Sequence, residues 1–396
     1  MENLKGNKWV EIDILAIKNN LLNIQAHLAD RARLIGVVKA NGYGHGAIEV
    51  ARILQQNGVD FLAVSYLDEA LKIRNSGIKS SIMLFSPLID ELEIKEAIEN
   101  EITLAITSIY DSQLINKVSS KLRIPVNIHL KVDTGLGRFG IYDEDLIDIC
   151  NDLLNNPFIY IEGIFTHVAE ANNEKHTINQ FKQFTEIINK LEHNNIHIPI
   201  KHFANSTVFL KYPEMHLDAV RIGTLLSGQF PVGDMPHPFE LTDPFSFKTK
   251  IISLREMQKG QYLGYYRTYR LKANAKVAVI PVGFSDGLVL EVANPPTNFL
   301  DLIKILLRTI LRYFNYSRFT MNVKIKNENY PIRGKVFMQM TLIELPIHSD
   351  VEVGDIVEVP MRKTLIDQDI VRLYVQGDLS GKVSRGNKTV YITKEG

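Results

Sequence analysis

Short apolar runs alternate with helix-like segments between residues 34 and 230, and this alternation determines the fold class. The runs are rich in β-branched residues, and most segments between them place apolar residues at i, i+3, i+4 and i+7 before a glycine. The runs cover residues 34–40, 61–66, 81–85, 102–106, 125–132, 159–168, 200–206 and 219–228. Eight such units predict an α/β fold, a parallel sheet closed into a TIM-type (β/α)8 barrel. A doubly wound open sheet is the competing architecture, although it usually has fewer strands.

The rest of the chain has a different texture. Residues 236–245, PHPFELTDPF, are rich in proline and typical of a linker. The runs after it, such as KVAVIPVGF and KTVYITK, are mainly β-like. We therefore predict a barrel domain over residues 1–238 and a mainly-β domain over residues 239–396.

One segment of the second domain is not β-like. Residues 300–314, LDLIKILLRTILRYF, have apolar residues at helical spacing and basic residues at positions 304, 308 and 312. This pattern predicts an amphipathic helix with a basic face, within a helical insertion near 295–320. We expect the helix to pack on its domain or on a partner chain. Contact with a membrane surface is the alternative.

Charge and cysteine content exclude several classes of protein. The chain has 45 basic and 45 acidic residues, so nothing favours binding to nucleic acid. Its single cysteine, Cys150, excludes an internal disulfide and favours a reducing compartment; we expect a buried, inert thiol. The sequence has neither the apolar core of a signal peptide nor a long apolar run, so we expect a cytoplasmic protein without a membrane span.

Barrel enzymes carry their chemistry at the carboxyl ends of the strands. The first run ends in VVKANGYGHG, which places Lys39 and Tyr43 among glycines that allow close approach of a ligand. The seventh and eighth runs end in HFANS and RIGTLLSG, where barrels often bind phosphate. The residues at these two ends are Asn205, Ser206, Arg221, Gly223 and Thr224. Ser206 could also cap the helix that follows it.

The fifth and sixth runs add charge to the same rim. LKVDTGLGRFGI supplies Lys131 and Arg138, and THVAEA supplies His167. A pyridoxal-phosphate (PLP) enzyme needs a lysine for the Schiff base, a phosphate cradle and a group that faces the pyridine nitrogen. The rim offers that set, and we predict no metal site.

Seven motifs together resemble, in order and spacing, those of the alanine racemase family: VVKANGYGHG, LKVDTGLGRFG, GIFTHVAEA, HFANS, VRIGTLLSG, GYYRTY and IPVGFSDG. The resemblance is dense over residues 7–290 and looser beyond. It implies a PLP-dependent isomerase that interconverts L- and D-alanine and serves D-alanine biosynthesis. It also implies a homodimer whose active sites are shared between subunits, with a small amino acid as substrate.

The resemblance implies a role for each matching residue. Lys39 would carry PLP and act as one base, and Tyr265 of the second subunit would act as the other. Tyr43, Ser206, Gly223 and Thr224 would hold the phosphate, Arg221 would face the pyridine nitrogen, and His167 would orient Tyr265 or Arg221. Arg138 and the backbone N–H of Met338 would bind the substrate carboxylate, and Lys131 matches a lysine that is often carbamylated.

The sequence departs from the family pattern at four positions. Phe284 replaces a tyrosine, Gln339 an aspartate and Gly381 a tyrosine, and Tyr266 replaces the usual glycine. A tyrosine-to-glycine change removes the wall of a methyl-sized pocket, so we expect activity to extend to serine, unless Tyr266 or Tyr374 fills the space.

Two alternative functions follow from the same motifs. One is a PLP-dependent amino-acid decarboxylase of this fold, which would need a catalytic cysteine from the β domain. The other is a degenerate racemase homologue that binds PLP with weak or no turnover.

Overall fold

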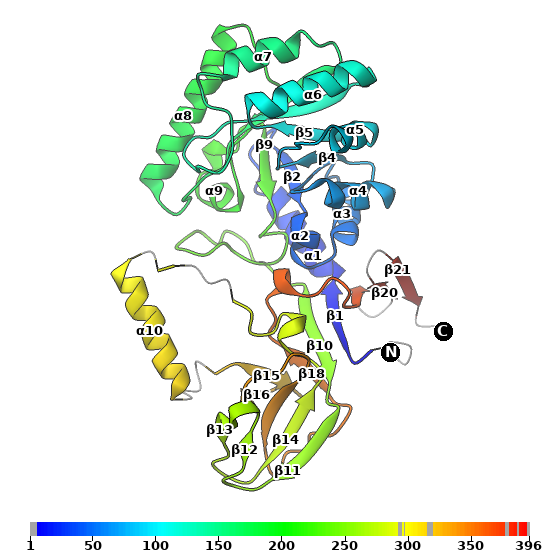
Figure 1. The fold of residues 1–396 in the computed structure, drawn as a ribbon, viewed down its shortest axis with the longest axis vertical. Coiled ribbons are helices and arrows are strands. Elements are labelled where there is room, and N and C mark those ends of the chain that lie inside the picture. Colours follow the sequence, from blue (N-terminus) through cyan, green and yellow to red (C-terminus); the bar gives the residue numbers. More distant parts are fainter. Residues whose placement is uncertain are drawn as a thin grey trace. The chain divides into compact units, whose positions relative to one another are not determined.

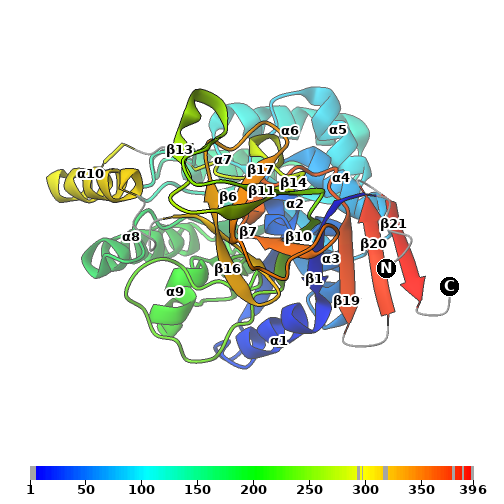
Figure 2. The same ribbon diagram turned by 90° about the horizontal axis from the view of Figure 1, so that it is seen from below.

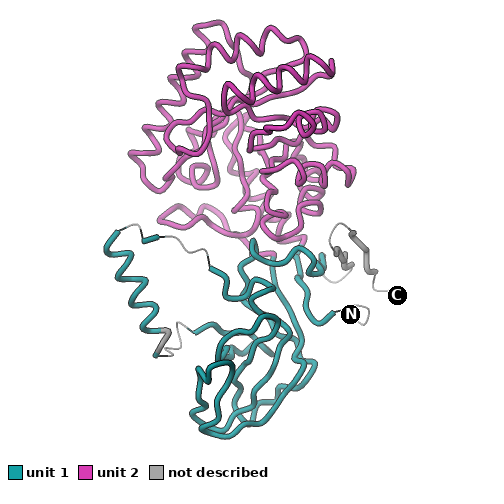
Figure 3. Tube along the Cα trace, in the orientation of Figure 1, with its two compact units in different colours: residues 1–13, 245–396 teal, residues 14–244 magenta. Residues whose placement is uncertain are grey.

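The computed structural model describes residues 6–291, 295–296, 298–314, 320–376, 380–385 and 388–393. The chain divides into two compact units, which Figure 3 distinguishes by colour. One consists of residues 14–244, and the other joins residues 1–13 to residues 245–396.

Residues 14–244 form the predicted (β/α)8 barrel (Figure 1). Its strands are β2 (Arg33–Val37), β3 (Phe61–Val64), β4 (Ser81–Leu84), β5 (Ile102–Ile106), β6 (Val126–Lys131), β7 (Ile159–Phe165), β8 (Ile200–His202) and β9 (Ala219–Ile222). They pair in parallel in the order β8-β7-β6-β5-β4-β3-β2-β9. Backbone hydrogen bonds from Asp218 to Lys201 (3.0 Å) and from Arg221 to Ala204 (2.9 Å) join the two edges, which closes the barrel.

Helices cover the outside of the barrel. They are α1 (Ile14–Gln25), α3 (Ala47–Gln56), α4 (Leu67–Asn75), α5 (Glu91–Glu99), α6 (Ile109–Leu122), α7 (Leu146–Leu154), α8 (Glu174–His193) and α9 (Ser206–Lys211). The short segment α2 (Lys39–Tyr43) lies instead directly after β2, at the carboxyl end of the strand. The strands are therefore covered on both faces, and β3 and β5 are buried along their full length. Such strands read as continuous apolar runs, which is why the sequence reveals them.

The second unit is built on an eleven-stranded sheet, in the order β11-β14-β17-β16-β15-β18-β10-β1-β19-β20-β21. Its strands are β1 (Lys8–Asp13), β10 (Phe245–Lys250), β11 (Ser253–Met257), β14 (Ala275–Ile280), β15 (Asn322–Ile325), β16 (Glu328–Arg333), β17 (Thr341–Pro346), β18 (Ile356–Val359), β19 (Arg372–Gln376), β20 (Ser380–Arg385) and β21 (Lys388–Thr393). A separate hairpin pairs β12 (Tyr262–Leu263) with β13 (Tyr269–Arg270). The mainly-β second domain is thus confirmed.

The observed boundaries differ from the expected division at residue 238. Residues 8–13 form β1, which pairs with β10 and β19 in the β unit rather than with the barrel; Figure 2 shows β1, β19, β20 and β21 side by side. The proline-rich linker stays with the barrel as far as residue 244. Asn20 of α1 exchanges hydrogen bonds with the backbone of Thr242 (2.8 and 2.9 Å), and Asn23 donates to Glu240 O (2.9 Å). A local composition reading cannot detect these long-range pairings.

The expected amphipathic helix is present as α10 (Phe299–Tyr313). Asn298 precedes it, and the Asn298 side chain accepts a hydrogen bond from Asp301 N (2.9 Å), as an N-cap does. Residues 292–294, 297 and 315–319 of the predicted insertion lie outside the described residues. Across the described residues, no helix is long and apolar enough to cross a membrane.

Candidate active site

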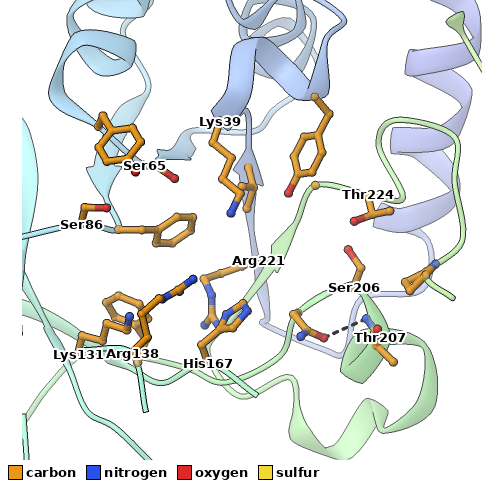
Figure 4. A pocket seen from close by; sticks show the side chains of 18 of the residues that line it. Lys39, Ser65, Ser86, Lys131, Arg138, His167, Ser206, Thr207, Arg221 and Thr224 are labelled. Atoms are coloured by element: carbon orange, nitrogen blue, oxygen red, sulfur yellow. Dashed lines mark hydrogen bonds between the residues drawn. The ribbon is translucent and has the colours of Figure 1, made fainter. Parts of the chain in front are cut away.

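A cavity of about 350 Å³ lies at the carboxyl ends of the barrel strands (Figure 4). Ten residues expected from the sequence line it: Lys39, Tyr43, Lys131, Arg138, His167, Asn205, Ser206, Arg221, Gly223 and Thr224. In Figure 4 the Lys39 amino group points into the cavity, with Ser206 and Thr224 on one side and Lys131 and Arg138 on the other. The sequence motifs therefore meet in one place within residues 14–244.

The turn after β2 gives Lys39 its position. Residues 40–43 all have positive φ, between 51° and 62°, and so form a left-handed turn. Each non-glycine residue in this conformation costs roughly 1–2 kcal/mol, which the surroundings must offset. The Glu69 carboxylate contributes by accepting a hydrogen bond from the backbone N–H of Ala40 (2.6 Å). This tight turn places both Lys39 and Tyr43 on the cavity wall.

Gly223 and Tyr43 approach each other closely. A Cβ atom on Gly223 would lie 2.4 Å from the Tyr43 hydroxyl oxygen, so only glycine allows this ring position. Burial raises the pKa of Tyr43 to about 12, which keeps its hydroxyl protonated and able to donate. The pair therefore forms a tight wall with a hydrogen-bond donor, beside Thr224.

The N-terminus of α9 supplies the opposite part of this wall. Asn205, not Ser206, caps the helix: its Oδ1 accepts hydrogen bonds from Thr207 N (3.0 Å) and Val208 N (3.1 Å). The alternative role of Ser206 as the cap is therefore wrong, because Ser206 is already the first residue of α9. The Ser206 hydroxyl is left on the cavity wall, beside a helix N-terminus that favours anions.

Arg221 is fixed by backbone carbonyls. It is 4% exposed and donates to His202 O (2.7 Å), Thr166 O (2.7 Å) and Phe203 O (3.1 Å). These bonds hold the guanidinium in one orientation without neutralising its charge. Burial lowers the Arg221 pKa to about 9, so the side chain remains a cation at neutral pH.

A chain of hydrogen bonds runs from Arg221 through the barrel interior. Arg221 also contacts His202 Nδ1 (3.1 Å), His202 Nε2 contacts His129 Nδ1 (2.8 Å), and His129 Nε2 contacts Glu162 (3.2 Å). Since arginine only donates, His202 Nδ1 must accept. A neutral His202 then donates from Nε2 to His129 Nδ1, and a neutral His129 donates from Nε2 to Glu162. Burial lowers the pKa of both histidines, which keeps them neutral. The chain thus links a buried cation to a carboxylate through two oriented imidazoles.

Positive charge dominates the rest of the cavity. Burial, then Arg138, lowers the Lys39 pKa, which Glu69 partly offsets. Burial lowers the His167 pKa to about 3, and Arg221 and Arg138 add to the effect, so this imidazole is neutral. The lowered pKa of Lys39 favours its neutral amine, which is a nucleophile and a base. The cations Arg138 and Arg221 on the same cavity wall attract an anionic ligand.

Lys131 is the most constrained of these cations. It is 2% exposed, and its Nζ makes no hydrogen bond to any residue that the structure describes. Nζ lies 3.4 Å from the centre of the Phe139 ring. Burial first, and then the positive charges of Arg138 and Arg221, lower the Lys131 pKa to about 7.

This low pKa makes the stability of the protein depend on pH. The unfolded chain, with an ordinary lysine pKa, binds the proton more tightly than the folded protein between pH 7 and 10.5. Raising the pH through this window therefore favours the folded protein, so its free energy of unfolding should rise with pH. Lys131→Met removes this contribution. We expect the wild-type free energy of unfolding minus that of the variant to increase from pH 6.5 to pH 9.5 (roughly the span of the shift), measured by urea unfolding in CO2-free buffer. A difference that stays constant with pH contradicts the assignment.

Two expected residues, Tyr265 and Met338, belong to the β unit. Tyr265 is 65% exposed, and its ring packs edge-on against Phe337, with 5.0 Å between ring centres. Met338 is the next residue, is 60% exposed, and accepts hydrogen bonds through its carbonyl from Ser285 N (3.0 Å) and Ser285 Oγ (2.8 Å). The two therefore lie on one exposed surface of the β unit.

Sequence reasoning missed part of the cavity wall. The missed residues include Ser65, Tyr66, Phe85 and Ser86, which follow β3 and β4. The rule that strand ends carry the chemistry would have found them, but they belong to no recognised motif. Phe139 and Phe165 were missed because an apolar residue carries no chemical signal of its own.

Comparisons with known proteins identify the family. Residues 12–231 match the family model described as alanine racemase, N-terminal domain, and residues 245–371 match that of the C-terminal domain. The chain is 34% identical to an alanine racemase of Methanococcus maripaludis over 356 residues, which cover 89% of this chain and 88% of that one. It is also similar to the structure of an alanine racemase of Clostridium difficile 630 (25% identity, TM-score 0.84, 99% of both chains). A structure from Bacillus anthracis with bound L-Ala-P is similar as well (26% identity, TM-score 0.80, 98% of this chain and 97% of that one). The chain belongs to the alanine racemase family.

Proposed function

We propose that the protein is a PLP-dependent alanine racemase. The observation that carries the proposal is the position of Lys39, with a lowered pKa, in a cationic cavity opposite a wall of hydroxyl groups. That arrangement fits PLP. Lys39 would hold the cofactor, and the α9 N-terminus with Tyr43, Ser206, Gly223 and Thr224 would hold its phosphate.

PLP, when bound, withdraws electrons from the amino acid and makes its Cα proton acidic enough to remove. Arg221 would face the ring nitrogen as a cation already fixed by three carbonyls. A guanidinium donates a proton to this nitrogen far less readily than a carboxylic acid does. Arg221 would therefore limit the electron withdrawal and disfavour side reactions such as transamination.

Two residues would move the proton. Racemisation removes the Cα proton from one face and returns a proton to the other, so two opposed groups serve it better than one. Lys39 Nζ is one such group, since its lowered pKa leaves more of the neutral amine. The Tyr265 hydroxyl is the other. Arg138, on the cavity wall, and Met338 would bind the substrate carboxylate.

We further propose that the protein is a homodimer whose sites are shared, with Tyr265 supplied by the second copy. Tyr265 and its neighbour Met338 are both exposed on the β unit, as groups that complete a partner's site must be. His167 would orient Tyr265 or Arg221 as a neutral imidazole.

Product analysis tests the proposed reaction. Purified PLP-loaded protein is incubated with L-alanine, and the products are separated by chiral chromatography with parallel detection of CO2. We expect D-alanine without CO2. Release of CO2 would instead identify a decarboxylase, which is disfavoured because Cys150 is fully buried in α7 and burial raises its pKa to about 12. A bound cofactor without turnover would identify a degenerate homologue.

Activity toward serine is a further prediction. Gly381 lies in β20 and pairs with Val375 of β19. Tyr374 is 1% exposed within the β unit and Tyr266 is 84% exposed. If Gly381 leaves room beyond the substrate methyl group, Gly381→Tyr should raise the ratio of kcat/KM for alanine to that for serine by about 10-fold, the usual effect of one group in a pocket. Gly381→Ala is the matched control and should leave the ratio near wild type. An unchanged ratio in the tyrosine variant would show that Gly381 does not determine the preference between alanine and serine.

A further inference from the structure

Helix α10 stands apart from the strands of its own unit in Figures 1 and 2. Every residue from Leu302 to Ile310 is exposed. The exposed fractions of large apolar side chains reach 73% at Phe299, 54% at Leu306 and 50% at Ile310. Leaving so much apolar surface in water is unfavourable, and contiguous patches of this kind mark interaction surfaces.

The two faces of α10 have opposite character. At 3.6 residues per turn, the apolar residues Phe299, Leu302, Ile303, Leu306, Leu307 and Ile310 fall within about half of the circumference. The opposite arc carries Asp301, Lys304 and Arg308, and the sequence continues the basic series at position 312. Leu300 and Leu311 fall at the edge of this half, and Ile305 falls outside it. Residues 299–313 thus carry three basic side chains and one acidic side chain, although the whole chain has no net charge.

We propose that α10 is an interfacial helix that docks the protein onto an anionic lipid surface. Its cationic polar face complements acidic lipid headgroups, and its apolar face suits the boundary between headgroups and acyl chains. Lysine and arginine can lay their alkyl stems along that boundary while the charged ends reach the phosphates. With 15 residues, about 22 Å by helical rise, α10 is too short to span a bilayer and would lie in its plane.

The width of the apolar face favours a lipid surface over a second helix. A helix that pairs with one other helix needs only a narrow apolar seam, whereas a helix at a lipid surface buries a whole side. The apolar half of α10 contains no charged residue, so nothing there would set the register of a helix pair.

Vesicle flotation tests the proposal with the full-length, PLP-loaded protein. The probes are phosphatidylcholine vesicles and vesicles of phosphatidylcholine mixed with phosphatidylglycerol. We expect flotation with the anionic vesicles, weakened by high salt, and little with the neutral ones. Lys304→Glu/Arg308→Glu should lower the partition coefficient by at least about 10-fold, since each basic residue near such a surface contributes appreciably. Leu306→Ser/Ile310→Ser should lower it similarly.

Control variants distinguish an effect on lipid binding by α10 from an effect on the active site. Lys182→Glu on the exposed face of α8, where the side chain is 74% exposed, is a single charge reversal on another helix and should float as wild type. Racemisation of free alanine should be unchanged in all three variants, so failure of the proposed function and failure of lipid docking are read independently. Absence of flotation, or equal flotation with neutral vesicles, overturns the proposal. So does a shift of Leu306→Ser/Ile310→Ser to a smaller oligomer without vesicles, which would assign the helix to a second copy of the chain.

Discussion

Lys39→Ala should abolish racemisation, lowering kcat for L-alanine by more than about 10⁴-fold. A single acid or base already contributes roughly 10²- to 10⁴-fold, and Lys39 is proposed both to hold PLP covalently and to move the proton. No other described lysine can replace it easily. Lys131 also lines the cavity, but it lies across from Lys39 in Figure 4, and its ammonium packs against the Phe139 ring.

The absorption spectrum of the variant provides a second readout. PLP held by a lysine absorbs at longer wavelength than PLP bound without a covalent link, so the visible band should be lost even if the cofactor remains. Lys182→Ala, at an exposed position on α8, is the matched control and should keep both spectrum and rate. Substantial turnover by Lys39→Ala would exclude this lysine as the cofactor-bearing residue.

Tyr265→Phe should reduce kcat by about 10²- to 10⁴-fold, because it removes one proton-transferring hydroxyl. The variant should still bind PLP normally, since Tyr265 belongs to the β unit and the residues proposed to hold the phosphate belong to the barrel. Lys39 should also continue to exchange the Cα hydrogen of one alanine enantiomer with solvent. The neighbouring Tyr266→Phe is the matched control, since Tyr266 is 84% exposed and should tolerate the change. Equal losses in both variants would indicate a structural effect on this turn.

Mixing the two inactive variants tests whether sites are shared. If Tyr265 acts in its partner's site, a dimer of one Lys39→Ala and one Tyr265→Phe subunit contains one complete site. Random exchange makes half of the dimers mixed, so up to about a quarter of wild-type activity should return. If both groups act within one chain, every mixed dimer lacks a complete site and no activity returns.

The barrel could be predicted from the sequence because its strands are buried on both faces. Runs such as FLAV in β3 and ITLAI in β5 are buried at every position and apolar at all but Thr103, and the helices between them show clear periodicity. The ten cavity residues were predictable as well, since strand ends in a closed barrel must converge. α10 was predictable because its apolar spacing requires no partner to be recognised.

Other features depend on contacts between distant parts of the chain. β1 belongs to the β unit only because residues 8–13 pair with β10 and β19, more than 200 positions away. The chain from Arg221 to Glu162 is another case. His129 and His202 lie on different strands, and a histidine in an apolar run gives no sign of its partner. Only the barrel geometry brings the two imidazoles within 2.8 Å.

Racemisation of L-alanine in D2O tests whether two opposed groups exchange the Cα proton. PLP-loaded protein converts L-alanine during its earliest turnovers, and mass spectrometry measures deuterium at Cα in each enantiomer. If one of Lys39 and Tyr265 removes the proton from one face and the other returns a proton to the opposite face, new D-alanine carries deuterium while the remaining L-alanine keeps protium. New D-alanine that retains the substrate's own protium would show that one group serves both faces, and would exclude the two-base mechanism.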